Sequence, residues 1–320
     1  MTIHTAQTDE PGVPGWAGRV DGEGPEHLRW HQAVRPYRSD CPAGASVFLG
    51  FASHAGVRRN KGRPGAAAGP DALRRALSSM ALAAPLEVYD AGTVAVTGDR
   101  MEEGQRALGT AARALLDAGH FPVVLGGGHE VAYATYLGLA ESTLRGGRRL
   151  GVLNLDAHFD LRDDPIPSSG TPFRQMLAAE GDALRYDVVG ISQPSNTRAL
   201  FDTADRFGVH YLLDEDCGVT QTATVAAFVD DFLADVDLVY LTIDLDVLPA
   251  AVAPGVSAPA AFGVPLETIQ TVCDQVTASG KLAICDVAEL NPSLDIDSRT
   301  ARTAARLLHR IVTKRVPITR

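Results

Sequence analysis

Four short polar segments follow apolar, β-prone runs in this sequence and carry the residue types that could do chemistry. They span residues 126–130, 156–160, 244–246 and 286–292. Alternate side chains of extended backbone point the same way, so the Asp-x-His-x-Asp and Asp-x-Asp spacings can direct their side chains toward one point. With the histidine of the first segment, the converging set has two imidazoles and four carboxylates: His129, Asp156, His158, Asp160, Asp244 and Asp246.

A cluster of four carboxylates is unstable by itself, because like charges repel and some groups would have to take up protons. Two divalent cations remove that problem. A mixed histidine and carboxylate set is too rich in oxygen for a structural zinc site and suits Mn²⁺ or a similar octahedral ion. Two-metal sites hold their ions roughly 3.5–4 Å apart and generate a hydroxide nucleophile near neutral pH. The spacing therefore predicts a binuclear metal centre with hydrolytic chemistry.

Each of these residues has a simpler explanation when it is taken alone. An aspartate at a strand end commonly caps the next helix, and a lone histidine is commonly just hydrogen-bonded. Convergence of all six at three strand ends favours the metal site over chance. The glycine triplet at 126–128 could form a phosphate-cradling turn. The surrounding pattern, however, is neither G-x-G-x-x-G nor a P-loop, which argues against a nucleotide.

The elements that must position these residues can be read from residue 46 onward, where β-prone runs alternate with helical periodicity. The strand candidates are 47–51, 86–89, 122–125, 150–155, 187–191, 209–212, 238–243 and 282–287, and the helix candidates include 70–80, 106–117, 130–139, 223–232, 266–276 and 299–312. This alternation predicts a three-layer αβα fold with a central, mostly parallel, eight-stranded sheet. Ligands of such sheets bind beyond the carboxyl ends of the strands, which is where the polar segments fall.

Residues 1–44 are rich in Gly and Pro and show no sustained period. We expect them to form an N-terminal arm packed on the body, with Trp16 and Trp30 as anchors that bury large rings. No linker or internal repeat breaks the remainder, so residues 45–320 are expected to form a single catalytic domain.

The composition excludes several classes of protein. A hydrophobic content of 45% indicates a folded globular chain, and the net charge of −10 argues against a nucleic-acid partner. No signal peptide and no apolar stretch of membrane-spanning length is visible. The four cysteines are scattered without a CxxC spacing, so neither a zinc ribbon nor a disulfide framework is indicated. We expect a cytoplasmic protein that acts on a small molecule.

The motifs also carry a resemblance. GGGHE, NLDAHFDLR, SSGTPFRQM, IDLDVLPAAVAPGVSAPA and DVAELNP resemble the arginase, agmatinase and formimidoylglutamase superfamily. The forms DAHFDLR, SSGTPFR and APGVSAPA are similar to the formimidoylglutamase branch, as are GRVDGEGPEHLRWHQAV and GVRRNKGRPGAAAGPDALR. The similarity runs from about residue 18 to the C-terminal helix and implies an arginase-like fold, two Mn²⁺ per subunit and a homo-oligomer, either a trimer or a hexamer.

The resemblance implies a role for each matching residue of the metal site. The first manganese would be bound by His129 and Asp160, the second by His158 and Asp246, and both would be bridged by Asp156 and Asp244. A hydroxide between the metals would attack an amidine carbon.

Two carboxylates are the catalytic candidates beyond simple metal binding. Asp160 would relay a proton to the departing nitrogen, and Glu289 would pair with a formamidinium group. A surface or capping carboxylate is the simpler alternative for Glu289. The segment His54-Ala55 departs from the acidic pair expected of relatives, which puts any role for that corner in doubt.

The substrate is expected to be acidic. Arginases carry a proton-shuttling histidine in the loop after the second metal strand, and Phe173 is matched to that place here. Arg162 follows the metal strand, whereas agmatine has no carboxylate that would require a cation there. N-formimidoyl-L-glutamate, an intermediate of histidine degradation with two carboxylates, accounts for the charges best and would give L-glutamate and formamide. The candidate substrate-binding residues are Arg162, Ser169, Thr171, Arg58, Arg59, Asn60 and Asn196.

Several alternatives stay open from the sequence. Arg58 and Arg59, with Lys61, could form a merely solvated basic loop, and Arg162 could pair with a neighbouring aspartate. The protein could be a ureohydrolase acting on another guanidino acid, since the same metal site would permit it. It could also be a non-catalytic relative that binds a small ligand, although intact metal ligands argue against this.

Overall fold

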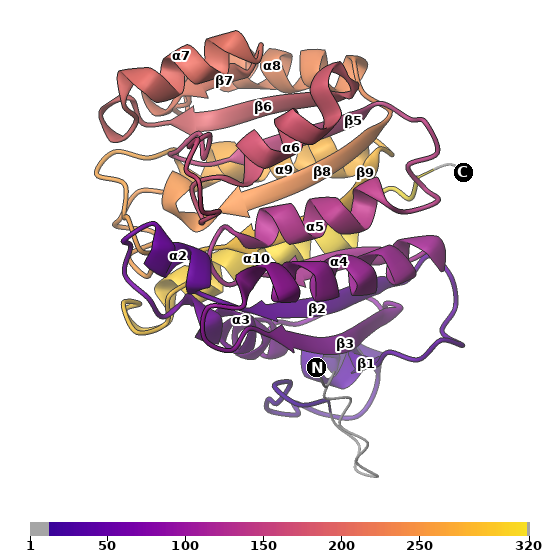
Figure 1. Ribbon diagram of the computed structural model, residues 1–320. Coiled ribbons are helices and arrows are strands. Elements are labelled where there is room, and N and C mark those ends of the chain that lie inside the picture. Colours follow the sequence, from indigo (N-terminus) through magenta and orange to yellow (C-terminus); the bar gives the residue numbers. More distant parts are fainter. Residues whose placement is uncertain (1–12, 319–320) are drawn as a thin grey trace.

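The computed structural model describes residues 13–318, which are organised around one parallel sheet (Figure 1). The strand order is β1-β3-β2-β4-β9-β8-β5-β6-β7, and every neighbouring pair is parallel. The strands are β1 (Arg35–Pro36), β2 (Ser46–Ala52), β3 (Val88–Ala95), β4 (Phe121–Leu125), β5 (Leu150–Leu155), β6 (Leu184–Ile191), β7 (His210–Leu213), β8 (Leu238–Asp244) and β9 (Leu282–Ala288).

The predicted fold class is confirmed, and all eight predicted strands are present. The ninth strand, β1, has only two residues and was not expected, because Arg35–Pro36 shows no alternating pattern. It pairs with β3 at the edge of the sheet. β3 also runs on to Ala95, beyond the predicted end at residue 89, because it continues pairing with β2.

Helices cover both faces of the sheet. They are α1 (Trp30–Ala33), α2 (Ala55–Arg59), α3 (Gly69–Ser78), α4 (Met101–Asp117), α5 (Val131–Ala140), α6 (Pro172–Glu180), α7 (Arg198–Arg206), α8 (Thr222–Ala234), α9 (Leu266–Ala278) and α10 (Arg299–Lys314). One apolar core contains buried residues of α3, α8, α9 and α10, and the other contains those of α4, α5, α6 and α7. Figure 1 shows α4, α5 and α6 in front of the sheet and α9 and α10 behind it. Among residues 13–318, no helix has the length and apolar character to cross a membrane.

The central strands are apolar because they are covered on both sides. The sequences FPVVL of β4, LGVLNL of β5 and LVYLTID of β8 are buried at every position, as is typical of parallel sheets. The register pairs Leu125 with Val287 and Leu155 with Ile243. The carboxyl ends of β4, β9, β8 and β5 therefore lie side by side, which is what the metal-site prediction requires.

The tryptophans of the N-terminal segment are anchored as expected. The rings of Trp16 and Trp30 pack on Phe48, with centroid distances of 5.2 Å and 5.6 Å. The indole Nε1 of Trp16 donates to Asp90 Oδ2 at 2.7 Å, and that of Trp30 donates to His309 Nδ1 at 2.9 Å. The division of the chain at residue 44 stays a prediction.

Asp90 is the buried charge that holds this side of the molecule together. Its carboxylate accepts two hydrogen bonds from Arg74, from Nε to Oδ2 at 2.7 Å and from Nη2 to Oδ1 at 3.1 Å. The side chains are only 3% and 1% exposed, so neither charge can be solvated if the other is removed. The Trp16 indole shares the same carboxylate oxygen, which ties the N-terminal segment to the sheet.

We expect the Arg74→Met substitution to lower the free energy of unfolding by about 3–5 kcal/mol, because it strands a buried carboxylate. Arg113 is the matched control, since it is half exposed and pairs with Asp117 on α4. Arg113→Met should cost about 1 kcal/mol or less, as exposed pairs do. Denaturant unfolding measures both values, and equal losses would contradict the structural role given to Arg74.

Candidate metal centre

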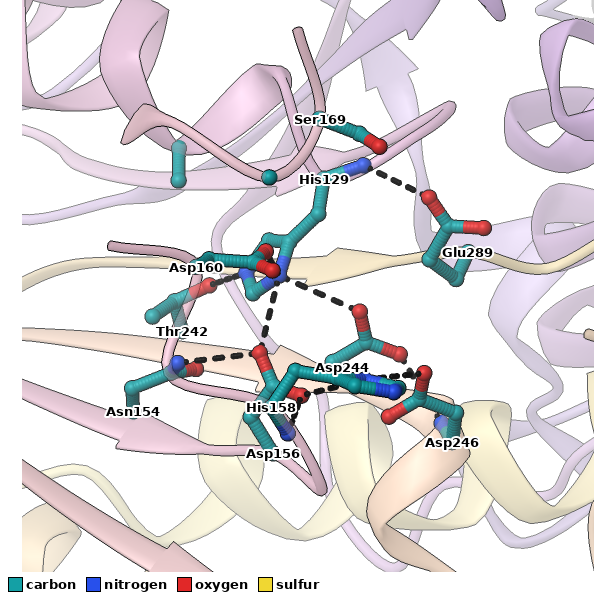
Figure 2. A network of polar contacts seen from close by, with 12 residues as sticks. His129, Asn154, Asp156, His158, Asp160, Ser169, Thr242, Asp244, Asp246 and Glu289 are labelled. Atoms are coloured by element: carbon teal, nitrogen blue, oxygen red, sulfur yellow. Dashed lines mark hydrogen bonds and ion pairs between the residues drawn. The ribbon is translucent and has the colours of Figure 1, made fainter. Parts of the chain in front are cut away.

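The predicted ligands come together at the carboxyl edge of the sheet (Figure 2). His129 lies between β4 and α5, the segment 156–160 follows β5, and Asp244 ends β8. Figure 2 shows the imidazoles and carboxylates turned toward one another from these separate strands. The convergence inferred from alternate spacing is therefore present in the structure.

One half of the cluster is centred on His129. Its Nδ1 lies 3.1 Å from one carboxylate oxygen of each of Asp156, Asp160 and Asp244. The same nitrogen is buried, and no contact within the described chain satisfies it as a hydrogen bond. An imidazole nitrogen surrounded by three carboxylate oxygens, yet without a hydrogen bond, has the arrangement of a metal ligand.

The second half is centred on His158. Its Nδ1 lies 3.1 Å from Asp246 Oδ2 and 3.4 Å from Asp156 Oδ1. Asp156 therefore offers one oxygen to each histidine, because its Oδ2 is the atom that faces His129. Candidate ligand atoms lie within 4.8 Å of one another in two overlapping groups, which share Asp156. This is the geometry expected of a bridging carboxylate between two cation positions.

The electrostatics of the cluster show why cations fit it. Burial, together with the charges of Asp246 and Asp156, raises the pKa of Asp244 well above its usual range. Burial and the charge of Asp156 likewise raise the pKa of Asp160. The protein alone thus supplies too little positive charge to keep all these carboxylates ionised. Two divalent cations would do so, and the mixed nitrogen and oxygen donors suit manganese.

A pocket of about 210 Å³ opens above the cluster. Its floor is formed by five of the six predicted ligands, all except Asp156. Of the other predicted site residues, Glu289, Arg162, Ser169, Asn60 and Asn196 line it. The remaining wall was not predicted, and it consists of Val57, Gly62, Ser195, Leu200, Ser257 and Ala258.

Glu289 is held beside the cluster by the backbone. Its Oε1 accepts a hydrogen bond from His129 N at 2.9 Å, whereas its buried Oε2 has no hydrogen bond within the described residues. Burial and the charge of Glu130 raise the pKa of Glu289 to about 8. With φ angles of 68° and 49°, Glu289 and Asp160 both lie in the left-handed region. Such strain is typical of functional positions, because the surrounding fold must stabilise it.

Arg162 points into the pocket with its guanidinium free. Within residues 13–318 this side chain is exposed and forms no hydrogen bond or ion pair. Among the described residues, Arg162 forms no ion pair with Asp163 or Asp164, and the carboxylate of Asp163 lies 3.7 Å from Arg174. A Cβ atom on Gly170 would lie 2.8 Å from Arg162 Cδ, so this glycine leaves room for the side chain.

Asn60, Ser169 and Asn196 differ in how free they are to meet a ligand. Asn60 Nδ2 donates to Ser169 Oγ at 3.2 Å, and both side chains line the pocket. The amide of Asn196 is engaged by backbone on both ends: Nδ2 donates to Ala157 O at 2.9 Å, and Oδ1 accepts from Phe159 N at 3.1 Å. Asn196 therefore holds the loop that carries the metal ligands.

Three predicted substrate-binding residues, Arg58, Arg59 and Thr171, are absent from the pocket wall. Arg58 Nη2 donates to Gly98 O at 3.0 Å. Arg59 pairs with Glu102 and donates to Pro167 O at 2.9 Å. The hydroxyl of Thr171 accepts from Ser168 N at 3.0 Å. These contacts brace the loops around the pocket, and a direct role of the three side chains in substrate binding stays a prediction.

Phe173, which was matched to the place of the arginase histidine, does not line the pocket. It is wholly buried, stacked on Tyr186 at 4.5 Å, and it meets the His129 ring edge-on at 5.3 Å. Between Ser168 and Phe173, the side chain that lines the pocket is that of Ser169. The segment 162–173 contains no histidine.

The fold and the cluster together define an α/β protein with a two-cation centre at the carboxyl edge of a parallel sheet. The model of the Arginase family matches residues 45–313, and the chain belongs to the arginase family.

Relatives place the chain more narrowly. It is 72% identical to "Formimidoylglutamase" of Rhodococcus jostii, over 95% of this chain and 97% of that protein. It is also similar to the structure of Trypanosoma cruzi formiminoglutamase with Mn²⁺₂, with a TM-score of 0.78 and 27% identity over 89% of this chain and 97% of the other. The Bacillus subtilis formimidoylglutamase structure shares the fold, with a TM-score of 0.79 at 22% identity and coverage of 88% and 90%.

We expect the purified protein to hold two Mn²⁺ per chain and Asp156→Ala to lose at least one, because Asp156 faces both histidines. Asp163→Ala is the matched control, since that carboxylate is 81% exposed and lies outside the cluster. Metal content after gel filtration gives the answer. Two retained ions in Asp156→Ala would show that Asp156 is not a bridge.

Proposed function

We propose that this protein hydrolyses N-formimidoyl-L-glutamate to L-glutamate and formamide, with two Mn²⁺ per subunit, in histidine degradation. The main support for the proposal is that one pocket holds an acidic and a basic side chain, neither of which is fully satisfied by the protein. The unpartnered carboxylate oxygen of Glu289 lies near the metal cluster, and the free guanidinium of Arg162 lines the same pocket. The name of the Rhodococcus jostii relative and the Mn²⁺₂ of the Trypanosoma cruzi structure support the substrate and the cofactor.

The metal ligands divide into two sets in this proposal. One cation would be held by His129 and Asp160 and the other by His158 and Asp246, and Asp156 and Asp244 would serve both. When bound, the two cations supply a hydroxide nucleophile near neutral pH and stabilise negative charge that develops in the reaction.

Glu289 and Asp160 act on the reacting end of the substrate. The free Oε2 of Glu289 accepts a hydrogen bond from the formamidinium group and fixes the amidine carbon above the cluster. A water oxygen adds to that carbon, and the bond from the carbon to the glutamate nitrogen breaks. Asp160 lines the pocket and carries a proton to the departing nitrogen, which leaves as the amine of glutamate.

Arg162 acts on the distal end of the substrate. A guanidinium binds a carboxylate through two parallel hydrogen bonds, a geometry that lysine cannot copy. The neutral donors Asn60 and Ser169 stand on the same wall, with Ser195 and Ser257 elsewhere in the lining. These groups offer hydrogen bonds to a second carboxylate without adding a net charge that would attract a cationic amine.

Two other functions are tested by the same preparation. A ureohydrolase for another guanidino acid would use the same metal site, and a panel of guanidino and formimino substrates separates it from the favoured function. A non-catalytic relative would show no product with any of them. An assay for glutamate and formamide release with manganese present is the most direct experiment.

The setting of the enzyme is part of the proposal. We place it in the cytoplasm as a homo-oligomer, a trimer or a hexamer, on the basis of the resemblance to the family. Sedimentation of the purified protein measures the number of subunits. With a net charge of −10, neither nucleic acid nor an anionic membrane surface is proposed as a partner.

Arg162→Ala should lower kcat/KM on the formimino substrate by roughly 30-fold or more, the scale of about 2–5 kcal/mol for a lost charged partner. Metal content and thermal stability should stay near the parent values, because the exposed side chain of Arg162 forms no hydrogen bond or ion pair with the rest of residues 13–318. Arg162→Lys should recover only part of the loss. Arg58→Ala is the matched control, since this arginine lies outside the pocket. Unchanged efficiency in Arg162→Ala would refute the carboxylate role.

Arginine and agmatine should release little urea with this enzyme. Agmatine brings an amine toward Arg162, and like charges in a pocket repel. The loop 162–173 also offers no histidine to move protons. The check is kcat/KM for both compounds against the formimino substrate at equal manganese. Comparable values for agmatine and the formimino substrate would overturn the assignment.

A further inference from the structure

A buried chain of polar groups lies behind the His129 ring, on the side away from the carboxylate cluster. His129 Nε2 lies 3.0 Å from Thr242 Oγ1, and Thr242 Oγ1 lies 2.6 Å from Asp286 Oδ1. Figure 2 shows the first of these contacts, with Thr242 behind the ring. Thr242 of β8 and Asp286 of β9 are register partners in the sheet, and His129 follows the next strand, β4.

The hydrogen-bond donors among these three side chains decide which nitrogen of the His129 imidazole carries the proton. Thr242 has one hydroxyl hydrogen, which it donates to Asp286 Oδ1. Its oxygen therefore faces the ring as an acceptor, and the ring proton must lie on Nε2 of His129. In a neutral imidazole the other nitrogen then carries a lone pair. That nitrogen, Nδ1, is the one that faces the three carboxylate oxygens.

Asp286 is an unusual residue for the centre of a sheet. It is fully buried, and no cationic side chain pairs with it among residues 13–318. Its second oxygen accepts a hydrogen bond from the hydroxyl of Tyr240, which is also fully buried. A buried carboxylate is costly unless every oxygen is hydrogen-bonded. Both donors come from β8, so the strand pairing itself supplies the partners that Asp286 needs.

His158 has no such support. It lies in the loop after β5, its side chain is 27% exposed, and its described polar contacts are made by Nδ1 and by its backbone N–H. The two histidines of the cluster therefore differ. The His129 ring is fixed by the buried relay of Thr242 and Asp286, whereas the His158 ring faces the pocket. Any effect of the relay should fall on one cation position and spare the other.

We propose that Thr242 and Asp286 are positioning residues that hold His129 in the metal-binding tautomer and so set the affinity of one of the two cation positions. The inference rests on the proposed role of His129 as a metal ligand. Partners of this kind behind a ligating histidine fix its orientation and raise its basicity. The remaining ligands of that position, Asp160 and the two bridging carboxylates, are untouched by the relay, so the position is weakened rather than abolished when the relay is broken.

The test compares Thr242→Val with Thr242→Ser. Valine has the shape of threonine without the hydroxyl, and serine keeps the hydroxyl. Mn²⁺ release from the loaded protein is measured against increasing concentrations of a chelator, which resolves the two ions. Thr242→Val should weaken one of the two binding steps by about 10–100-fold, and Thr242→Ser should stay near the parent. Asp286→Asn should weaken the same step, because an amide can donate to Thr242 and reverse the chain of hydrogen bonds.

The control is Thr277→Val, which removes another buried hydroxyl, in α9 and distant in sequence from the cluster; this hydroxyl donates to Cys273 O. It should leave both binding steps unchanged. Activity of Thr242→Val should return at saturating Mn²⁺, which loss of structure would not allow.

If both steps of Thr242→Val match the parent, or if Thr277→Val weakens them equally, the positioning role is wrong. If Thr242→Val does not fold, Asp286→Asn decides: one weakened binding step supports the positioning role, and two parent-like steps contradict it. A parent protein that holds fewer than two ions would instead refute the proposed metal site.

Discussion

Four carboxylates lie within contact distance of two histidines at one edge of the sheet, and three of them, Asp156, Asp244 and Asp246, are buried. Unpaired charges cannot stay ionised in a buried site, and desolvation and mutual repulsion raise the pKa of Asp244. A parallel sheet solves the problem of placement, because the ends of β4, β5, β8 and β9 deliver their side chains to a single edge. Two divalent cations would neutralise the clustered carboxylates and keep them ionised. The same cations then provide the chemistry.

The backbone around the cluster is closely packed at two glycines and has positive φ angles at two carboxylate residues. A Cβ atom at Gly127 would lie 1.9 Å from Ser53 O, and one at Gly126 would lie 2.6 Å from Val287 O. These glycines therefore let the turn after β4 pack between its neighbours, which explains them without any phosphate. The backbone φ angles of Asp160 and Glu289 lie in the strained left-handed region, and both side chains line the pocket.

Much of this was visible in the sequence, because it rests on local periodicity. The buried strands and the alternate spacing of Asp156, His158 and Asp160 follow from two-residue periodicity alone. The pocket wall could not be predicted from this periodicity, because loops from distant parts of the chain form it. Arg59 carries a charge like that of Arg162, yet only the fold shows that it pairs with Glu102. Helix α7 was missed because it has only nine residues, and its apolar face consists of Leu200, Phe201 and Ala204 alone.

Anomalous diffraction at the manganese edge, from crystals of the manganese-loaded protein, would locate the cations directly. We expect two peaks about 3.5–4 Å apart. One should lie against His129 and Asp160, the other against His158 and Asp246, with Asp156 between them. A single peak, or peaks away from these side chains, would contradict the claim that two cations balance this cluster.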